Sequence, residues 1–222
     1  MKEIKVCKNK HAFTLAEVLI TLGIIGVVAA ITLNTLINNC QKQSTVVRLK
    51  KMYNGLNYIM QMAVNDNGDM KTWDFTEQGL LNADSNFYKT YINPYLKTIK
   101  KNYYGVSTSY YSTTIYNIKG GELYQSARWE ILPDGTAISL FSNGITTKQH
   151  GYFWIFIDTN GPKKPNRLGK DIFMTNINLN RNSIEFWSAY DCNKNSSGMY
   201  SGGSCGYKIM HDGWKISDDY PW

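Results

Sequence analysis

The side chain most open to a chemical role is that of Glu17, the only charged residue in an apolar run over residues 13–37. A charge near the centre of a bilayer costs about 2.5 kcal/mol or more, so carboxylates in spanning helices usually have a partner and a task. We therefore expect Glu17 to pair with a cation. The alternative is a glutamate that lies near the membrane edge and reaches the headgroups without a specific partner.

Two cysteines near the end of the chain, Cys192 and Cys205, flank a segment rich in glycine and serine. This arrangement favours a disulfide formed in an oxidising compartment. Closing a loop of this length stabilises a fold by ~3 kcal/mol in the chain-entropy description. Two free thiols are the alternative. A zinc site is disfavoured because only His211 lies nearby and the paired Cys/His spacing is absent.

A third group consists of oxygen-bearing side chains around glycine turns at Asp158, Asn160 and Asp171. Carboxylate and amide oxygens are ligands for hard cations, so these residues form a candidate calcium site. The segment lacks the terminal bidentate glutamate of an EF-hand. Four basic residues also oppose a cation there: Lys163, Lys164, Arg167 and Lys170. Ordinary turn chemistry is the alternative.

Catalysis has little support in the sequence. Residues 202–206 fit the pattern G-x-S-x-G, but that motif needs a preceding strand and a following helix, and here it falls in a glycine- and serine-rich loop. His211 is too close in sequence for the usual order of serine, acid and histidine. The sequence contains no H-E-x-x-H, phosphate-binding loop or dinucleotide fingerprint. We expect that the protein is not an enzyme.

The apolar run that carries Glu17 is long enough to span a membrane. Its 25 residues measure about 37 Å as a helix, against a hydrocarbon core of about 30 Å. A removable signal peptide would be shorter, and here Ala29 and Ala30 are followed by further apolar residues. Lys8 and Lys10 lie nearest the apolar edge and favour an N-terminus inside the cell. The cysteine pair would then lie outside the cytoplasm.

The start of the chain carries a family resemblance. Residues 8–31 read KNKHA followed by FTLAEVLITLGIIGVVAAI, which resembles the class III signal of type IV pilins and type II secretion pseudopilins. The resemblance covers about 25 contiguous residues: a basic leader, an aromatic first mature residue and a glutamate at the fifth mature position. It implies that a prepilin peptidase cuts between Ala12 and Phe13 and methylates the new amine. Ala12 stands where the family usually has glycine.

The same resemblance implies a partner for Glu17. In that family the glutamate faces the amine of a neighbouring subunit, which here is the amine of Phe13 after cleavage. An unpaired buried charge is costly, so this pairing would fix the register between subunits. The implied partners are the prepilin peptidase, other pilin or pseudopilin subunits and an inner-membrane assembly platform. Some pseudopilins also bind calcium in a loop of the region that contains Asp158.

The remainder of the chain predicts an α+β fold. Apolar residues recur at helical spacing to about Val64, and residues 65–68 supply a stop. Strands are predicted over residues 103–116, 127–132, 136–141 and 152–157, with a hairpin turn at residues 133–135. We expect a long N-terminal helix, membrane-spanning first and amphipathic second, packed on an antiparallel sheet with a C-terminal disulfide loop. The predicted parts are a removed leader (1–12), a membrane or filament-core helix (13–37), an amphipathic helix (38–66) and a head domain (67–222).

Charge limits the classes of partner. The net charge is +7, and residues 1–12 contribute four lysines and one glutamate, which leaves +4 for the rest. This is too mild for a nucleic-acid-binding protein. Residues 43–65 contain no acid but three bases, and Lys42 precedes them. This basic segment could attract lipid headgroups or acidic neighbours, and a plain solvated surface is the alternative.

Together these features predict a structural, pilin-like subunit that assembles into a type II secretion or type IV pilus-like filament. Its expected location is the inner membrane of a bacterial cell, crossed once, with the head outside the cytoplasm. The alternative is a single-pass, membrane-anchored extracytoplasmic binding domain that does not polymerise. Glu17 would then be incidental.

Overall fold

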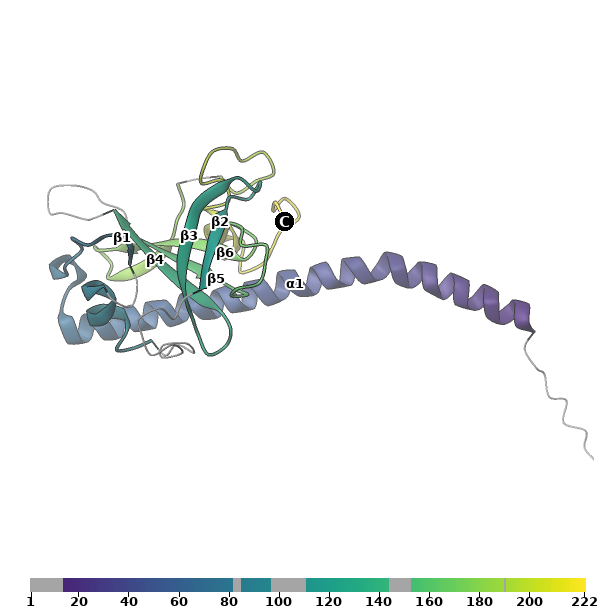
Figure 1. Ribbon diagram of the computed structural model, residues 1–222, viewed down its shortest axis with the longest axis horizontal. Coiled ribbons are helices and arrows are strands. Elements are labelled where there is room, and N and C mark those ends of the chain that lie inside the picture. The colour runs from purple at the N-terminus through teal and green to yellow at the C-terminus, as the bar shows by residue number, and fades with distance from the viewer. Residues whose placement is uncertain (1–13, 82–84, 97–110, 144–152, 190) are drawn as a thin grey trace, which may run out of the picture. The chain divides into compact units, whose positions relative to one another are not determined.

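The computed structural model describes residues 14–81, 85–96, 111–143, 153–189 and 191–222 (Figure 1). The helices are α1 (Leu15–Asn67), the 3-10 turn η1 (Met70–Thr72), the π-helical turn η2 (Tyr88–Ile92) and α2 (Cys205–His211). The strands are β1 (Gln78–Leu81), β2 (Tyr111–Tyr116), β3 (Glu122–Ile131), β4 (Ala137–Asn143), β5 (Phe153–Asp158), β6 (Ile172–Asn178) and β7 (Ser183–Phe186). The chain divides into two compact units, Met1–Lys42 and Gln43–Trp222, which we describe separately.

The described part of the first unit is the beginning of α1, and it is apolar on all sides. Residues 14–41 are exposed throughout, including every leucine, isoleucine and valine among them. Within the described residues, α1 is the one helix long and apolar enough to cross a membrane. The hydroxyls of Thr21 and Thr32 donate to the carbonyls of Val18 (3.0 Å) and Val28 (2.9 Å). These two polar groups are therefore satisfied within the helix, as an apolar surrounding requires.

In the second unit, α1 is buried on one face. Its buried residues recur at three- and four-residue steps: Val46, Leu49, Met52, Leu56, Ile59, Met60 and Ala63. The helix ends at Asn67, and Gly68 follows with φ of +83° while its N–H donates to the carbonyl of Val64 (2.8 Å). Glycine adopts this backbone conformation without a Cβ penalty, which is why it ends helices. The predicted stop at residues 65–68 is confirmed.

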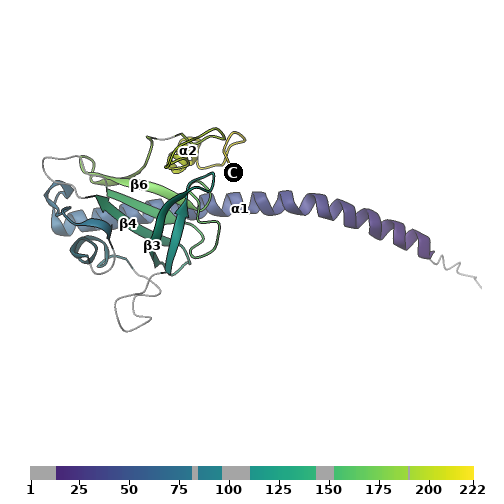
Figure 2. The same cartoon turned by 45° about the horizontal axis from the view of Figure 1, so that its top comes forward.

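The sheet is an antiparallel meander in the order β2-β3-β4-β5-β6-β7. Strand β1 pairs with the C-terminal half of β4, and β3 pairs with its N-terminal end. Its central strands cross the head section of α1 (Figures 1 and 2). Strand β5 is buried along its whole length. Phe153, Ile155 and Ile157 belong to the core shared with α1, while Trp154 and Phe156 belong to a second cluster. The sheet thus has a hydrophobic core on each face.

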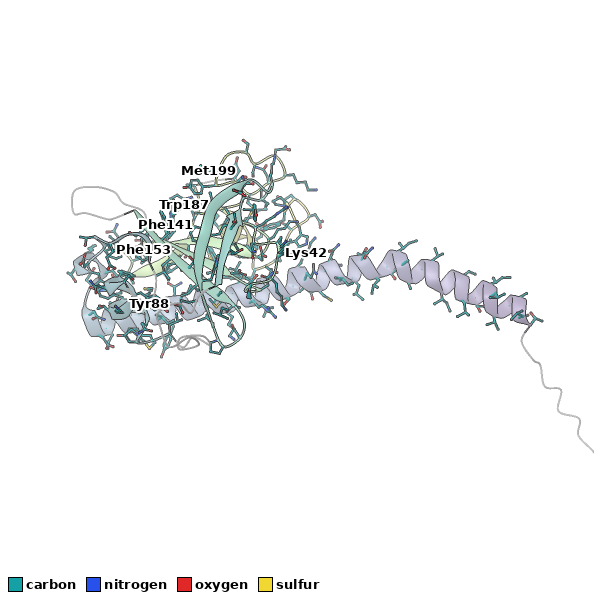
Figure 3. The ribbon with its side chains drawn as sticks, viewed as in Figure 1. Lys42, Tyr88, Phe141, Phe153, Trp187 and Met199 are labelled. Carbon is teal, nitrogen blue, oxygen red and sulfur yellow. A yellow bond between two sulfur atoms is a disulfide. The ribbon has the colours of Figure 1, made fainter. Side chains whose placement is uncertain are left out.

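An aromatic cluster joins the segment after α1 to this core. The ring of Phe153 lies 4.5 Å from that of Phe87 and 5.6 Å from that of Phe75, measured between centroids. Trp73 stacks on Tyr91 at 4.1 Å. Figure 3 labels Phe153 and Tyr88, and both are buried. Rings at these separations stabilise a fold beyond the area that they bury.

The predicted hairpin turn is confirmed, and the predicted strands overlap with β2 to β5. Gly135 has φ of +83°, and its N–H donates to the carbonyl of Leu132 (2.9 Å). Strand β3 begins earlier than predicted, at Glu122, and residues 103–110 of the first predicted strand lie outside the described residues. Strands β1, β6 and β7 and helix α2 were not predicted. Strand β6 is buried on both faces for most of its length, which removes the alternation that marks a strand in sequence.

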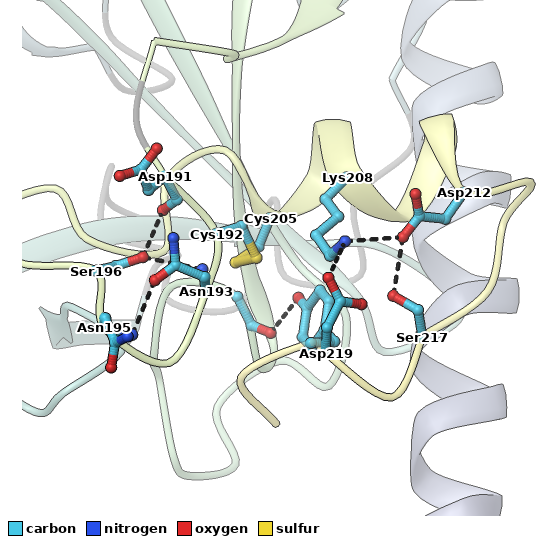
Figure 4. The surroundings of a disulfide bond; sticks show 12 residues. Asp191, Cys192, Asn193, Asn195, Ser196, Cys205, Lys208, Asp212, Ser217 and Asp219 are labelled. Atoms are coloured by element: carbon cyan, nitrogen blue, oxygen red, sulfur yellow. Dashed lines mark hydrogen bonds and ion pairs between the residues drawn. A yellow bond between two sulfur atoms is a disulfide. The ribbon is translucent and has the colours of Figure 1, made fainter.

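The C-terminal segment is fixed by one covalent bond and a small ionic network. The disulfide between Cys192 and Cys205 is confirmed. The ammonium of Lys208 lies 3.1 Å from Asp212 Oδ2 and 2.8 Å from Asp219 Oδ2 (Figure 4). The hydroxyl of the buried Tyr220 donates to a backbone carbonyl in the loop before β6. These contacts hold the last residues of the chain against the head.

Asn57 connects α1 to the edge of the sheet. Its Nδ2 donates to the carbonyl of Ile184 in β7 (3.1 Å), and its Oδ1 accepts from the N–H of the same residue (2.8 Å). One amide side chain thus satisfies both backbone groups of an edge-strand residue, which otherwise would have to find water or another strand.

We therefore expect Asn57→Ala to lower the free energy of unfolding of the head by about 1–3 kcal/mol, because two partly buried backbone groups lose their partner. The exposed Asn54, one turn earlier on α1, is the matched control, and Asn54→Ala should change the stability little. The measurement is denaturant unfolding of the detergent-solubilised chain, followed by tryptophan fluorescence. Equal stabilities of the two variants would contradict the role given to Asn57.

The disulfide makes a second prediction, because Cys40 is exposed and unbonded. In mature protein that is unfolded without reductant, an alkylating reagent should modify Cys40 and spare Cys192 and Cys205. Peptide mass spectrometry reads the outcome. Prior reduction serves as the control and should make all three thiols reactive, whereas labelling of Cys192 without reductant would refute the bond.

Candidate processing and assembly site

Glu17 lies in the first turn of α1, where it forms a reciprocal cap with Thr14. The Thr14 hydroxyl oxygen accepts from the N–H of Glu17 (3.2 Å). In return, Glu17 Oε2 accepts from the N–H of Thr14 (2.8 Å) and from its hydroxyl (2.9 Å). This is a capping box, in which side chains satisfy N–H groups that a helix start leaves without intrahelical partners. A carboxylate at this place also complements the positive end of the helix dipole.

The sequence contains the signal for this cap, although only a cationic partner was predicted for Glu17. The spacing Ser/Thr-x-x-Glu before an apolar run indicates a capping box, and Thr14 and Glu17 have that spacing. Within the single chain, the partner of Glu17 is thus Thr14. Its second oxygen, Oε1, has no hydrogen-bond partner among the described residues. The carboxylate can therefore accept one more donor while the cap stays formed.

The predicted cleavage and methylation residues, Ala12 and Phe13, lie outside the described residues. Their place in the sequence still has a consequence for the cap. Both members of the capping box follow the predicted cut, with Thr14 next to Phe13. Cleavage would therefore create an amine one residue before the cap and leave the cap itself intact.

The structure brings together the three residues of the candidate calcium site. Asp158 Oδ1 accepts from the N–H groups of Asn160 and Gly161, both at 2.9 Å. Asn160 turns its Nδ2 to Asp171 Oδ2 (3.1 Å). Asp171 also accepts from the N–H of Arg167 through Oδ1 (2.7 Å) and of Asn166 through Oδ2 (2.8 Å). In these contacts the two carboxylates organise the turn, as the alternative interpretation supposed.

Electrostatics at this turn is dominated by burial. Asp171 is 3% exposed, and burial raises the pKa of its carboxyl above the usual value, although the N–H donors of Arg167 and Asn166 act in the opposite direction. Among the described residues, no group of three or more His, Cys, Asp or Glu side chains could hold a metal. Calcium binding at Asp158, Asn160 and Asp171 stays a prediction.

The G-x-S-x-G segment is partly corrected by the structure. It was expected to lie wholly in a loop, but helix α2 begins at Cys205, directly after Ser204. The described residues from 191 to 204 form turns and bends rather than a strand, so the strand that should precede this motif is missing from that stretch. Ser204 is 4% exposed, and the next residue is in the disulfide.

Comparisons with known proteins agree with the site at the start of α1. Residues 7–33 match the model of the prokaryotic N-terminal methylation motif. Residues 35–222 match the model of a family of unknown function, DUF6613. No curated protein and no solved structure gives a match.

The first match covers most of the apolar run, Glu17 and the predicted cut after Ala12. It identifies the prepilin-type cleavage and methylation signal of type IV pilins and pseudopilins. This signal and the exposed apolar helix agree with a membrane-anchored protein. The second match covers most of the chain, so the protein belongs to the family DUF6613 and carries a prepilin-type signal in front of the residues that define that family.

Proposed function

We propose that this protein is a structural subunit that assembles through α1 into a type II secretion or type IV pilus-like filament. One observation carries the proposal: a prepilin-type signal includes the start of a helix that is apolar and exposed on all sides over residues 14–41. Apolar surface of this extent is unfavourable in water. Lipid covers it while the chain is anchored, and helices of other subunits cover it once the chain leaves the membrane.

Small residues in this part of α1 support close approach of other helices. A Cβ added at Gly23 or Gly26 would meet no atom within 4 Å. Packing within the chain therefore gives no reason for glycine at these two positions. In apolar surroundings, small residues allow helix backbones to come close together.

The charge arrangement supports a defined register between subunits. The capping box holds Glu17 at the helix end where cleavage would create the Phe13 amine. Oε2 of Glu17 accepts from Thr14. Oε1 accepts from no donor among the described residues, so it can accept from a group outside the chain. We infer that this group is the amine of a neighbouring subunit. Pairing in low dielectric then penalises any register that leaves either charge alone.

The remaining features define the setting of the proposed subunit. The partners are a prepilin peptidase, other pilin or pseudopilin subunits, an inner-membrane assembly platform and membrane lipid. The head lies outside the cytoplasm of a bacterial cell, an orientation supported by Lys8 and Lys10 and by the disulfide. We propose no catalytic activity and no nucleic-acid partner. A secretion pseudopilin is favoured, followed by a pilus or DNA-uptake pilin.

A second candidate function has one observation in its favour. Because Thr14 satisfies Glu17 Oε2 within the chain, Glu17 has a structural reason to be present even without a neighbouring subunit. A membrane-anchored extracytoplasmic binding domain that never polymerises would need no more than this cap. Processing and assembly separate the two functions.

A third prediction concerns processing. In cells with an active prepilin peptidase, intact mass and N-terminal sequencing of the membrane protein should show loss of residues 1–12 and one added methyl on Phe13. Cells without the peptidase are the control and should retain the chain from Met1. An unprocessed chain in the presence of the active peptidase would overturn the pilin function.

A fourth prediction separates charge from capping at Glu17. Glu17→Gln keeps an oxygen that can accept from Thr14 N–H but removes the negative charge, and Glu17→Ala removes both. We expect both variants to insert in the membrane and to give at least about tenfold less filament than the wild type, because the Phe13 amine would lack its counter-charge. Sheared filament per cell, measured by immunoblot, gives the yield.

Thr21→Val is the matched control, because it changes a polar side chain in the same helix without changing charge. Its filament yield should equal that of the wild type. A normal yield from Glu17→Gln would refute the pairing, and a defect confined to Glu17→Ala would assign the effect to the cap.

A further inference from the structure

The loop between β5 and β6 presents a group of cations at the surface of the head. Its basic residues are Lys163, Lys164, Arg167 and Lys170, which together we call the basic loop. Lys163 and Lys164 are exposed, and the other two are half-buried. Within the described part of the chain, none of the four forms an ion pair with a carboxylate. Four positive charges therefore lie within one loop of the head.

The acids of the same segment do not offset this charge at the surface. Asp158 and Asp171 are 0% and 3% exposed, and both accept backbone N–H groups inside the turn. On the neighbouring hairpin turn, Asp134 is already paired with Lys51 at 2.7 Å. The carboxylates thus shape the loop from within, and the cations remain outside.

The basic loop is held in place before any partner binds. Arg48 Nη1 on α1 donates to the carbonyl of Thr159 (3.0 Å). The N–H of Tyr116 in β2 donates to the carbonyl of Asn166 (3.0 Å), and its carbonyl accepts from the N–H of Leu168 (2.9 Å). A partner would therefore meet an ordered surface and would not have to order a flexible segment, which favours binding.

The contact with Arg48 also limits how far the basic loop can be from the anchor. Arg48 follows Ile37, the last residue of the apolar run, by eleven residues in the same helix, a rise of about 16 Å. Lys42, Lys50 and Lys51 lie nearby in sequence, and residues 43–65 contain no acid. The connection between the apolar run and the basic loop therefore consists of eleven residues of α1 and the contact of Arg48 with Thr159. Tethering of this kind gives the membrane surface a high effective concentration.

We propose that the basic loop, together with Arg48, binds the phosphates of anionic phospholipids in the membrane that anchors the chain. Basic residues near a leaflet that contains anionic lipids attract the headgroups, and each lysine or arginine near such a surface strengthens association about fivefold. An acidic protein would match the same charge, but the anchor places this chain in contact with lipid before any subunit joins it, so lipid is the favoured partner. The contact would hold the anchored head against the membrane and would weaken when the subunit leaves it.

The test uses the full chain in vesicles of phosphatidylcholine alone or of equal parts phosphatidylcholine and phosphatidylglycerol. Reductive methylation with formaldehyde and dimethylamine–borane, which are both uncharged, gives the reactivity of each lysine: formaldehyde forms an imine with the free amine and the borane reduces it. Peptide mass spectrometry then locates the methyl groups. We expect Lys163 and Lys164 to react about fivefold more slowly in the anionic vesicles. The difference should vanish near 1 M salt, where the Debye length falls to about 3 Å.

Two exposed lysines elsewhere in the head, Lys71 and Lys89, are internal controls and should react equally in both vesicles. The double variant Lys163→Gln/Lys164→Gln should reduce the protection of Lys170, whereas Lys71→Gln/Lys89→Gln should leave it unchanged. Equal reactivity of Lys163 and Lys164 in the two vesicles, or equal protection of Lys71, would overturn the proposal.

Protection that is absent in vesicles but present in isolated filaments would also overturn it, in favour of an acidic partner subunit. Because the vesicles contain no assembly machinery, failure of lipid binding leaves the filament proposal untouched. Failure of assembly likewise leaves the vesicle result valid.

Discussion

The head of this protein depends on one contact, the burial of a single face of α1 against the central strands of the sheet. Leu49, Leu56 and Met60 are at most 1% exposed, and so are Ile155 and Ile157 of β5 across from them. Helix α1 supplies seven buried residues to the core on that face of the sheet, and the second hydrophobic cluster lies on the other face. The helix is therefore a structural part of the head and also the continuation of the apolar segment. A force that moves the apolar part of α1 therefore acts on the same helix whose later residues form the core of the head.

The sequence was a reliable guide wherever a pattern had one structural solution. Gly68 after a helical period predicted the helix end, and Gly135 after Pro133 and Asp134 predicted the turn. Two cysteines around a glycine-rich segment predicted the disulfide. The helix end and the turn depend on local chemistry, because only glycine readily takes the positive φ that both sites need. The disulfide depends on an oxidising compartment and on the short loop between its cysteines.

The missed elements depend on contacts between distant residues. The side chain of Asn57 bonds to Ile184, 127 positions later, so its part in holding β7 had no local signal. Strand β6 is buried on both faces and lost its alternation, and α2 begins inside a segment whose composition is typical of a loop. The cap between Thr14 and Glu17 is different, because its spacing was visible in the sequence. Because a charge in an apolar run suggested a cation as partner, Thr14 was not predicted as the partner of Glu17 within the chain.

The position of that cap changes what removal of the leader would mean for the helix. Since both capping residues follow the predicted cut, the precursor and the mature chain would share one helix start, and no turn would have to be rebuilt. Cleavage changes the charge at the N-terminus that would have to cross the bilayer. Before the cut, drawing the N-terminus outward through the bilayer would carry four lysines with it; afterwards it would carry one amine, beside a carboxylate already fixed at the helix end. Cleavage would thus lower the electrostatic barrier to extraction and leave the cap at the start of α1 in place.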